Sequence, residues 1–245
     1  MSPPYVRSSM YLTILGCNGP YPEKGGACSG YLIESDSGST RIVLDLGAGC
    51  LSELLKNVDD ITDIDGVVLS HLHFDHMSDM GALGYMLDFK DIEALKLICP
   101  DTPCDNKKLI KGKFDIYPPK DTQIGEFKLE FIRVRHPVES YAVKIICDGA
   151  TLVYTGDTNE CAEISLFSCG ADTLLADCGL SEGDWTHAKP HLSPKKCALL
   201  AKESGAKELI LTHLSPRYDK EELLNDAFAV FPDAMLAEKG MRVRI

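Results

Sequence analysis

A run of histidines around one aspartate is the clearest chemical signal in the chain. Residues 70–76 read Ser-His-Leu-His-Phe-Asp-His and directly follow the apolar run 67–69, which predicts a buried strand ending in a loop. Imidazole and carboxylate groups suit borderline divalent ions such as zinc. His71 and His73 alternate and can point the same way from an extended backbone, while Asp75 and His76 belong to the following turn. This loop can therefore supply ligands to two neighbouring ions, and the alternative is a polar surface loop with chance histidines.

Three further predicted strands each lead to one candidate ligand, namely His136, Asp157 and His213. The strands span residues 127–135, 151–155 and 208–212. α/β sheets usually place their sites at the carboxyl ends of strands. A single histidine in such a position is more often a structural group. Together with the loop at 70–76, however, these residues form the set that a binuclear site requires.

The pattern resembles the metallo-β-lactamase superfamily, whose HxHxDH motif matches residues 71–76. Residues 13–17 resemble the opening strand and glycine turn of that fold, and residues 42–49 resemble its strand-Asp-x-Gly element. The resemblance covers nearly the whole chain. It implies an α+β fold, a four-layer αββα sandwich of two mixed sheets with helices outside, formed by a single domain over residues 1–245.

The same resemblance implies a distribution of ligands between two metals. The first metal takes His71, His73 and His136, the second takes Asp75, His76 and His213, and Asp157 bridges both. We expect two divalent ions, zinc first and manganese as the alternative. A hydroxide bridging them would be the nucleophile. In this superfamily Asp75 is also expected to orient that hydroxide.

Within the superfamily, the C-terminal third resembles the ribonuclease Z-like branch. Residues 211–218 read Leu-Thr-His-Leu-Ser-Pro-Arg-Tyr, close to that branch's LTHxSxRY signature. The resemblance implies that His191 lies beside the metals and contacts the scissile phosphate, and that Asp177 orients it. The branch normally carries His-Glu-Ala-Thr where this chain has His-Leu-Ser-Pro. Asp75, His191 and Asp177 are thus the candidate catalytic residues.

Two observations argue against a long nucleic acid as substrate. True ribonuclease Z has a long arm that grips transfer RNA between the positions of His136 and Asp157, and here only a hairpin with an Asp148-Gly149 turn fits. Lysine and arginine total 25 against 37 acidic residues, a net charge of −12. Phosphate backbones are bound mainly through basic side chains. We therefore expect a small phosphodiester substrate. The one basic cluster, Lys107 to Lys113, is interpreted as a solvated helix face.

The remaining patterns bound the organisation of the chain. We expect helices at 50–57, at 80–89 and from Ser193 and Pro194 to a closing Gly205, with a last strand at 241–245. The N-terminal residues 1–5 lack an apolar segment and no run is long enough to span a membrane, so we expect a cytoplasmic protein. Ten scattered cysteines without a CxxC pair predict buried free thiols rather than disulfides. We expect neither catalysis by Cys178 nor more than a surface or loop-anchoring role for His187.

Three classes of function fit these features. The first is a phosphodiesterase acting on small diesters or cyclic nucleotides. The second is a tRNA 3′-processing endoribonuclease, which the missing arm and the charge disfavour. The third is a carboxylic ester, lactone or thioester hydrolase on the same metals, which the His191 segment disfavours. A metal-sensing binding module fits poorly, because the ligand set is complete. We also expect a homodimer from the family resemblance.

Overall fold

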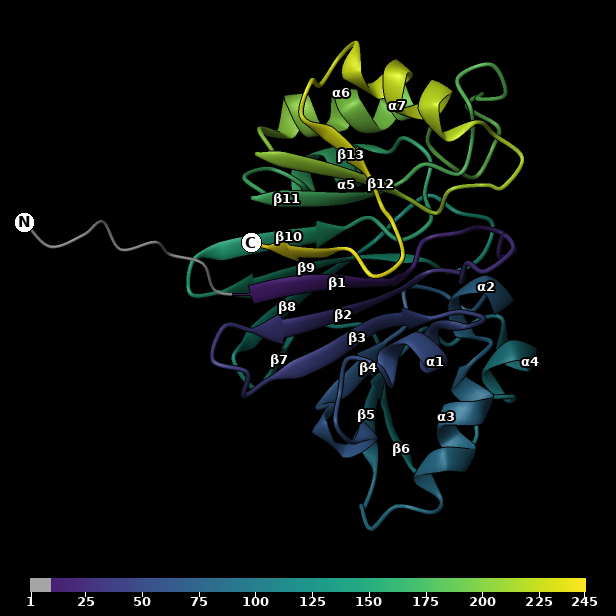
Figure 1. The fold of residues 1–245 in the computed structure, drawn as a ribbon, viewed down its shortest axis with the longest axis vertical. Helices are drawn as coiled ribbons and strands as arrows, with labels where there is room; N and C mark the ends of the chain where they lie inside the picture. Colours follow the sequence, from purple (N-terminus) through teal and green to yellow (C-terminus); the bar gives the residue numbers. More distant parts are fainter. Residues whose placement is uncertain (1–9) are drawn as a thin grey trace, which may run out of the picture.

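Two seven-stranded mixed sheets form the centre of the protein, as the computed structural model of residues 10–245 shows (Figure 1). The first sheet has the order β14-β1-β2-β3-β4-β5-β6 and the second the order β13-β12-β11-β10-β9-β8-β7. The strands of the first sheet are β1 (Met10–Gly16), β2 (Gly30–Ser35), β3 (Arg41–Leu46), β4 (Gly66–Val68), β5 (Leu95–Ile98), β6 (Phe114–Tyr117) and β14 (Arg242–Arg244). Those of the second are β7 (Thr122–Ile124), β8 (Phe127–Arg133), β9 (Tyr141–Cys147), β10 (Ala150–Tyr154), β11 (Thr173–Asp177), β12 (Glu208–Thr212) and β13 (Ala234–Leu236).

Helices cover the outer faces of both sheets. Those on the first sheet are α1 (Cys50–Leu54), the 3-10 turn η1 (Ile61–Asp63), α2 (Phe74–Met77), α3 (Met80–Leu87) and α4 (Cys104–Lys107). Those on the second are α5 (Ala162–Phe167), α6 (Pro194–Ser204) and α7 (Lys220–Phe228). No helix in the described part of the chain has both the length and the apolar character that a membrane span needs.

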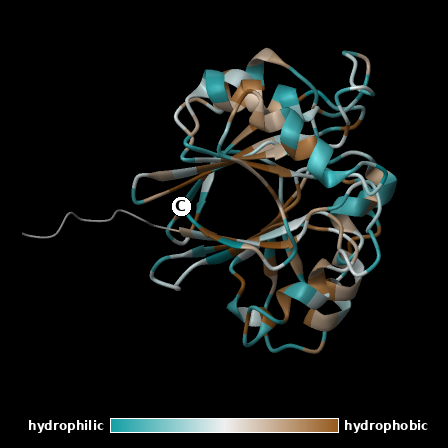
Figure 2. Ribbon diagram, turned by 45° about the horizontal axis from the view of Figure 1, so that its top comes forward, coloured by the Kyte–Doolittle hydropathy of each residue, from teal (hydrophilic) through white to brown (hydrophobic). Residues whose placement is uncertain are grey.

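Three separate apolar cores hold these four layers together. One lies between the sheets and includes Tyr31, Phe127 and Tyr154. The second packs the first sheet against α1 to α3, and the third packs the second sheet against α5 to α7. The strands are accordingly rich in hydrophobic residues, while the helices carry both hydrophobic and hydrophilic residues (Figure 2). The expected α+β, four-layer αββα sandwich is confirmed.

The two sheets are built on the same plan. In each, three neighbouring pairs are parallel and three are antiparallel. The chain also returns to its start, because β14 pairs with β1 across the registers Tyr11–Arg244 and Thr13–Arg242. The Asp148-Gly149 turn joins β9 to β10 as expected, with positive φ at both residues. Residues 1–5, where an apolar leader is not expected, lie outside the described part, and the single domain over 1–245 stays a prediction.

Several local predictions need correction. Helix α1 ends at Leu54 rather than at residue 57, and α3 ends at Leu87. The lysines of the basic cluster do not share one helix face, because α4 ends at Lys107 and Lys113 donates to the Lys90 carbonyl. Gly205 does close α6 in the left-handed conformation.

Ser193 stands at the N-cap of α6, but its hydroxyl does not cap the helix. It donates instead to the Glu182 carboxylate at 2.6 Å. All ten cysteines are free, and seven of them are buried, as the sequence predicted.

Candidate metal centre

The predicted ligands meet where strands of both sheets end. His71 to His76 follow β4 of the first sheet, and α2 carries Asp75 and His76. His136, Asp157 and His213 follow β8, β10 and β12 of the second sheet (Figure 1). These three strands run in the same direction, because β9 is antiparallel to both β8 and β10, and β10, β11 and β12 are parallel to one another. The carboxyl ends of these strands therefore lie at one edge of the sandwich. All seven predicted ligands are brought together there.

Three imidazole nitrogens converge in the first group of ligands. His73 Nδ1 lies 3.0 Å from His71 Nε2 and 3.2 Å from His136 Nε2. Four ligands at about 2.05 Å around a tetrahedral zinc ion stand about 3.3 Å apart. The three nitrogens are thus spaced as ligands of one small cation would be. Asp157 Oδ2 completes this group at 3.5 Å from His71 Nε2.

The second group lies against the other face of Asp157. His76 Nε2 lies 3.3 Å from Asp157 Oδ1 and 3.7 Å from Asp75 Oδ2. His213 closes the group, with its Nε2 at 3.8 Å from the same Asp75 oxygen. The two carboxylate oxygens of Asp157 thus face different groups, as a ligand shared between two ions requires.

Two unpaired atoms show that these residues fit metal ions. His76 Nε2 and Asp157 Oδ1 are buried and lie 3.3 Å apart, but neither makes a well-directed hydrogen bond to any group within residues 10–245. Such atoms are costly unless a ligand satisfies them. Asp157 itself is 2 % exposed, and His76 is fully buried. A cation in the second group would coordinate both atoms at once.

The protonation of the imidazoles fits the same conclusion. Burial lowers the pKa of His136 to about 4 and that of His71 well below its usual range. Both rings are therefore neutral near pH 7, which is the form that binds metals. Burial also opposes a charge on His76, but the carboxylates of Asp157 and Asp45 outweigh it and raise its pKa well above the ordinary value. The second group therefore attracts positive charge.

Asp45 fixes the ligand loop 70–76 through hydrogen bonds, a role that the sequence did not predict. It is fully buried at the end of β3, and its Oδ2 accepts hydrogen bonds from His76 Nδ1 at 2.8 Å and from the Tyr154 hydroxyl at 2.7 Å. The same carboxylate accepts from both the backbone N–H and the hydroxyl of Ser70, each at 2.7 Å. The Nδ1 proton of His76 is thereby fixed, and its Nε2 is left as the metal-facing atom. The strand-Asp-x-Gly element was the available signal.

His213 has an equally specific seat. Its backbone lies in the left-handed region, with φ 57°, and its Nδ1 lies 3.2 Å from the Ser29 hydroxyl. A Cβ on Gly19 would lie 2.1 Å from the His213 ring, so only glycine fits beside it. Neither Ser29 nor Gly19 carries a sequence signal that links it to His213. Their contact exists only because the loop after β1 meets the loop after β12.

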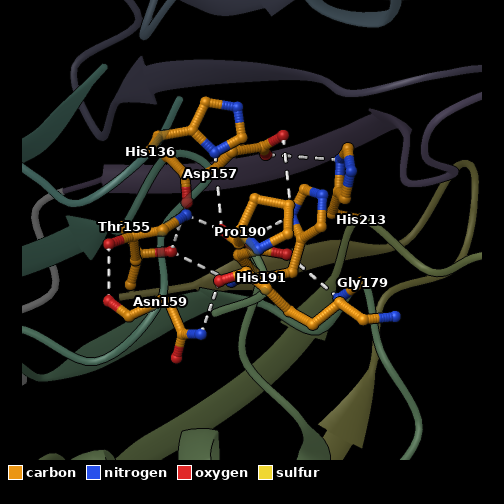
Figure 3. A network of polar contacts seen from close by, with 12 residues as sticks. His136, Thr155, Asp157, Asn159, Gly179, Pro190, His191 and His213 are labelled. Carbon is orange, nitrogen blue, oxygen red and sulfur yellow. Dashed lines mark hydrogen bonds and ion pairs between the residues drawn. The ribbon is translucent and has the colours of Figure 1, made fainter. Parts of the chain in front are cut away.

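His191 lies at the rim of the centre and is paired with Asp177. Its Nδ1 lies 2.9 Å from Asp177 Oδ2 and 3.8 Å from Asp157 Oδ2 (Figure 3). Asp177 is buried at the end of β11, where its carboxylate also accepts from the N–H groups of Thr158 and Gly179. Burial opposes a charge on His191, but the Asp177 carboxylate outweighs it and raises the pKa of the imidazole to about 9. The Nε2 of His191 is not used by Asp177.

The two residues without a predicted catalytic role stay outside the centre. His187 is exposed, with its ring edge against Trp185 and its Nδ1 3.7 Å from Glu160. Cys178 is fully buried in the core beneath α6. Neither position offers a reactive group to a substrate.

A family model described as Beta-lactamase superfamily domain matches residues 40–214. The probable metallo-hydrolase YhfI of Bacillus subtilis is 32% identical over 233 residues, which cover 91% of this chain and 94% of the relative. This chain belongs to the beta-lactamase superfamily. It is accordingly a metallo-hydrolase of that superfamily, and its His/Asp groups are suited to divalent metals.

Solved structures agree with this assignment. YhfI superposes with a TM-score of 0.89 at 30% identity, over 98% of this chain and 100% of that one. The short form of human tRNase Z shares the fold, with a TM-score of 0.76 at 19% identity over 95% of this chain and 98% of that one. In sequence, the ribonuclease Z of Methanosarcina acetivorans is 38% identical over 101 residues, which are 40% of this chain and 33% of the relative.

Proposed function

We propose that this superfamily member is a phosphodiesterase that hydrolyses small phosphodiesters or cyclic nucleotides with the help of two divalent metal ions, zinc first and manganese as the alternative. The observation that carries the proposal is the His191–Asp177 pair at the rim of the ligand groups. It supplies a proton donor directly beside the metal ligands. Hydrolysis of a diester needs such a donor, because its alkoxide leaving group must be protonated.

The geometry suits His191 to that task. Because Nδ1 donates to Asp177, any proton on Nε2 is free to reach a leaving oxygen. The Asp177 carboxylate raises the pKa of His191 and so favours the charged ring, and a charged imidazole also stabilises negative charge on a phosphoryl group. Asp177 is a positioning residue here, since its carboxylate contacts His191 and two backbone N–H groups.

The metal ligands fit two ions of the kind proposed. His71, His73 and His136 would hold the first, while Asp75, His76 and His213 would hold the second, with Asp157 shared. When bound, such ions polarise the phosphoryl oxygen and make water a nucleophile at neutral pH. Asp75 would orient the attacking oxygen, because its carboxylate points between His76 and His213.

The size and charge of the protein favour a small substrate. The connection between β9 and β10 is a tight Asp-Gly turn, so no arm for transfer RNA extends from it. The net charge of −12 disfavours a long phosphate backbone. The relatives named ribonuclease Z favour the phosphodiester bond as the scissile bond, and a tRNA 3′-processing activity is therefore the second candidate.

A panel of substrates tests the proposal. The purified protein is supplied with zinc or manganese and assayed on bis-(p-nitrophenyl) phosphate, on 2′,3′- and 3′,5′-cyclic nucleotides, on precursor transfer RNA and on a lactone. We expect turnover of the small diesters. Turnover of precursor transfer RNA alone would favour the endoribonuclease, and turnover of the lactone alone would overturn the phosphodiesterase proposal. His191→Ala serves as the matched variant, because it should slow diesters with an alkoxide leaving group more than bis-(p-nitrophenyl) phosphate, whose p-nitrophenolate leaves without a proton.

A further inference from the structure

Asn159 is a buried amide that the proposed chemistry does not use. It lies two residues beyond Asp157 and is fully buried. Its side chain points away from the metal ligands and into the loop 181–191, which carries His191 (Figure 3). Leu180 N–H donates to the Leu192 carbonyl at 3.2 Å, so this loop begins and ends at the same point.

The side chain of Asn159 fills the interior of that loop with hydrogen bonds. Its Nδ2 donates to the Thr186 carbonyl at 2.9 Å and to the Lys189 carbonyl at 2.6 Å. Its Oδ1 accepts from the indole N–H of Trp185 at 3.0 Å. One amide therefore satisfies three polar groups of the loop, and no smaller side chain can replace all three.

Three successive loop residues are then fixed by three different partners. The Lys189 carbonyl accepts from Asn159, the Pro190 carbonyl lies 3.4 Å from Nδ1 of His136, and His191 pairs with Asp177. The ring of Pro190 fixes its φ, so a shift of the Lys189 carbonyl would also shift the backbone of Pro190 and His191. Of these three partners, Asn159 is the one that is neither a proposed metal ligand nor a partner of His191.

We propose that Asn159 is the positioning residue that holds loop 181–191 against the centre, so that His191 reaches the leaving oxygen and Pro190 orients His136. The inference rests on the proposed function only for its effect on rate. The position of the loop can be measured without any substrate, because Trp185 is the single tryptophan of the chain and is bonded to Asn159. Lys196 Nζ also lies 4.2 Å from the centre of the Trp185 ring, so a shift of the loop would change the surroundings of the indole.

The experiment compares Asn159→Ala and the isosteric Asn159→Asp with the wild type and with Asn57→Ala. Asn57 is a matched control, because its exposed amide also donates to a carbonyl, that of Glu53, far from the loop. Each protein is loaded with zinc and characterised by metal content, by Trp185 emission and acrylamide quenching, and by hydrogen exchange of peptides covering 181–191.

We expect both Asn159 variants to keep their zinc, to shift Trp185 emission to the red and to exchange faster in the loop, while Asn57→Ala does none of these. On a diester with an alkoxide leaving group, kcat should fall by about 10- to 100-fold, the range for a slightly misplaced catalytic group. The loss should be smaller on p-nitrophenyl diesters, which need no proton. KM should change less than kcat.

If Asn159→Ala shows the same Trp185 emission, quenching and loop exchange as the wild type, the inference is overturned whatever the substrate is. Loss of zinc in step with activity would also overturn it, because Asn159 would then support the metals and not the loop. If Asn159→Ala does not fold, Trp185→Phe removes the indole donor and leaves the Asn159 side chain in place. Unchanged loop exchange in that variant would count against the positioning role of Asn159. If the loop changes are observed but the wild type turns over no diester, the proposed function is refuted and the positioning role of Asn159 remains.

Discussion

Replacing Asp45 by asparagine should lower the affinity of the second ligand group for its metal by about 10- to 100-fold, the usual effect of losing an outer-sphere partner. The carboxylate accepts four hydrogen bonds, one on Oδ1 from Ser70 N–H and three on Oδ2 from Ser70, His76 and Tyr154. An asparagine that keeps its oxygen toward Ser70 N–H would turn its NH₂ toward the other three groups. The two hydroxyls can rotate and accept, but His76 Nδ1 cannot do so while it carries a proton.

His76 would then have to move its proton to Nε2, the atom that faces Asp157 and the metal. If the amide is flipped instead, its NH₂ opposes the Ser70 N–H. A buried donor is unpaired if His76 keeps its proton on Nδ1 or if the amide is flipped, and this costs about 1–3 kcal/mol. The free energy of unfolding should therefore fall by a similar amount, together with the metal affinity.

The assay for this prediction is competition with a chromophoric chelator, combined with thermal unfolding at several zinc concentrations. Asp59→Asn, an exposed substitution near α1, is the control for the loss of one negative charge. The reasoning is refuted if Asp45→Asn folds normally and binds two zinc ions with the affinity of the wild type.

The other predictions concern the metals, the rim and the assembly. Protein purified without chelator should contain close to two equivalents of zinc or manganese, because seven ligand-type side chains exceed the needs of one tetrahedral ion; full activity with a single equivalent would contradict this. Asp157→Ala should abolish activity and lower metal content, since two cations would repel each other without the shared carboxylate; elemental analysis that finds both metals would show that the bridge is misassigned. His191→Ala should keep both metals and reduce kcat about 10²- to 10⁴-fold on diesters with poor leaving groups, and unchanged kinetics would favour an ester or lactone hydrolase. We expect a homodimer, for which exposed apolar side chains such as Phe89, 75 % exposed, are available, and sedimentation of a monomer at micromolar concentration would refute it.

The sequence predicted the parts of the site that strands deliver directly. His136, Asp157 and His213 each follow an apolar or alternating run, and such runs identify strands from local periodicity alone. Residues 71–76 were found because their side chains are unusual and close in sequence. The fold class followed from the resemblance that these residues carry, not from the periodicity of any one segment.

The outer partners could not be predicted in the same way. Asn159 and Ser29 are ordinary polar residues whose role depends on which distant loop packs against them. Ser193 had the pattern of a helix cap, but the nearby carboxylate of Glu182 competes for its hydroxyl. Helix α1 ends early because the N–H groups of Lys56 and Asn57 donate to carbonyls three residues back, those of Glu53 and Leu54, and the Asn57 side chain also donates to Glu53.

The seven ligands come from both halves of the sandwich, so bound metals would affect how the molecule unfolds. His73 follows a strand of the first sheet and His136 one of the second, and the same division separates His76 from His213. Each bound ion would therefore act as a reversible cross-link between the halves, comparable to a disulfide that a chelator can open. A site filled at 100 times its dissociation constant adds about 2.7 kcal/mol to the folded state. Separation of the two sheets would break both sites at once, so zinc supply would set how often the sandwich opens to proteases and to solvent.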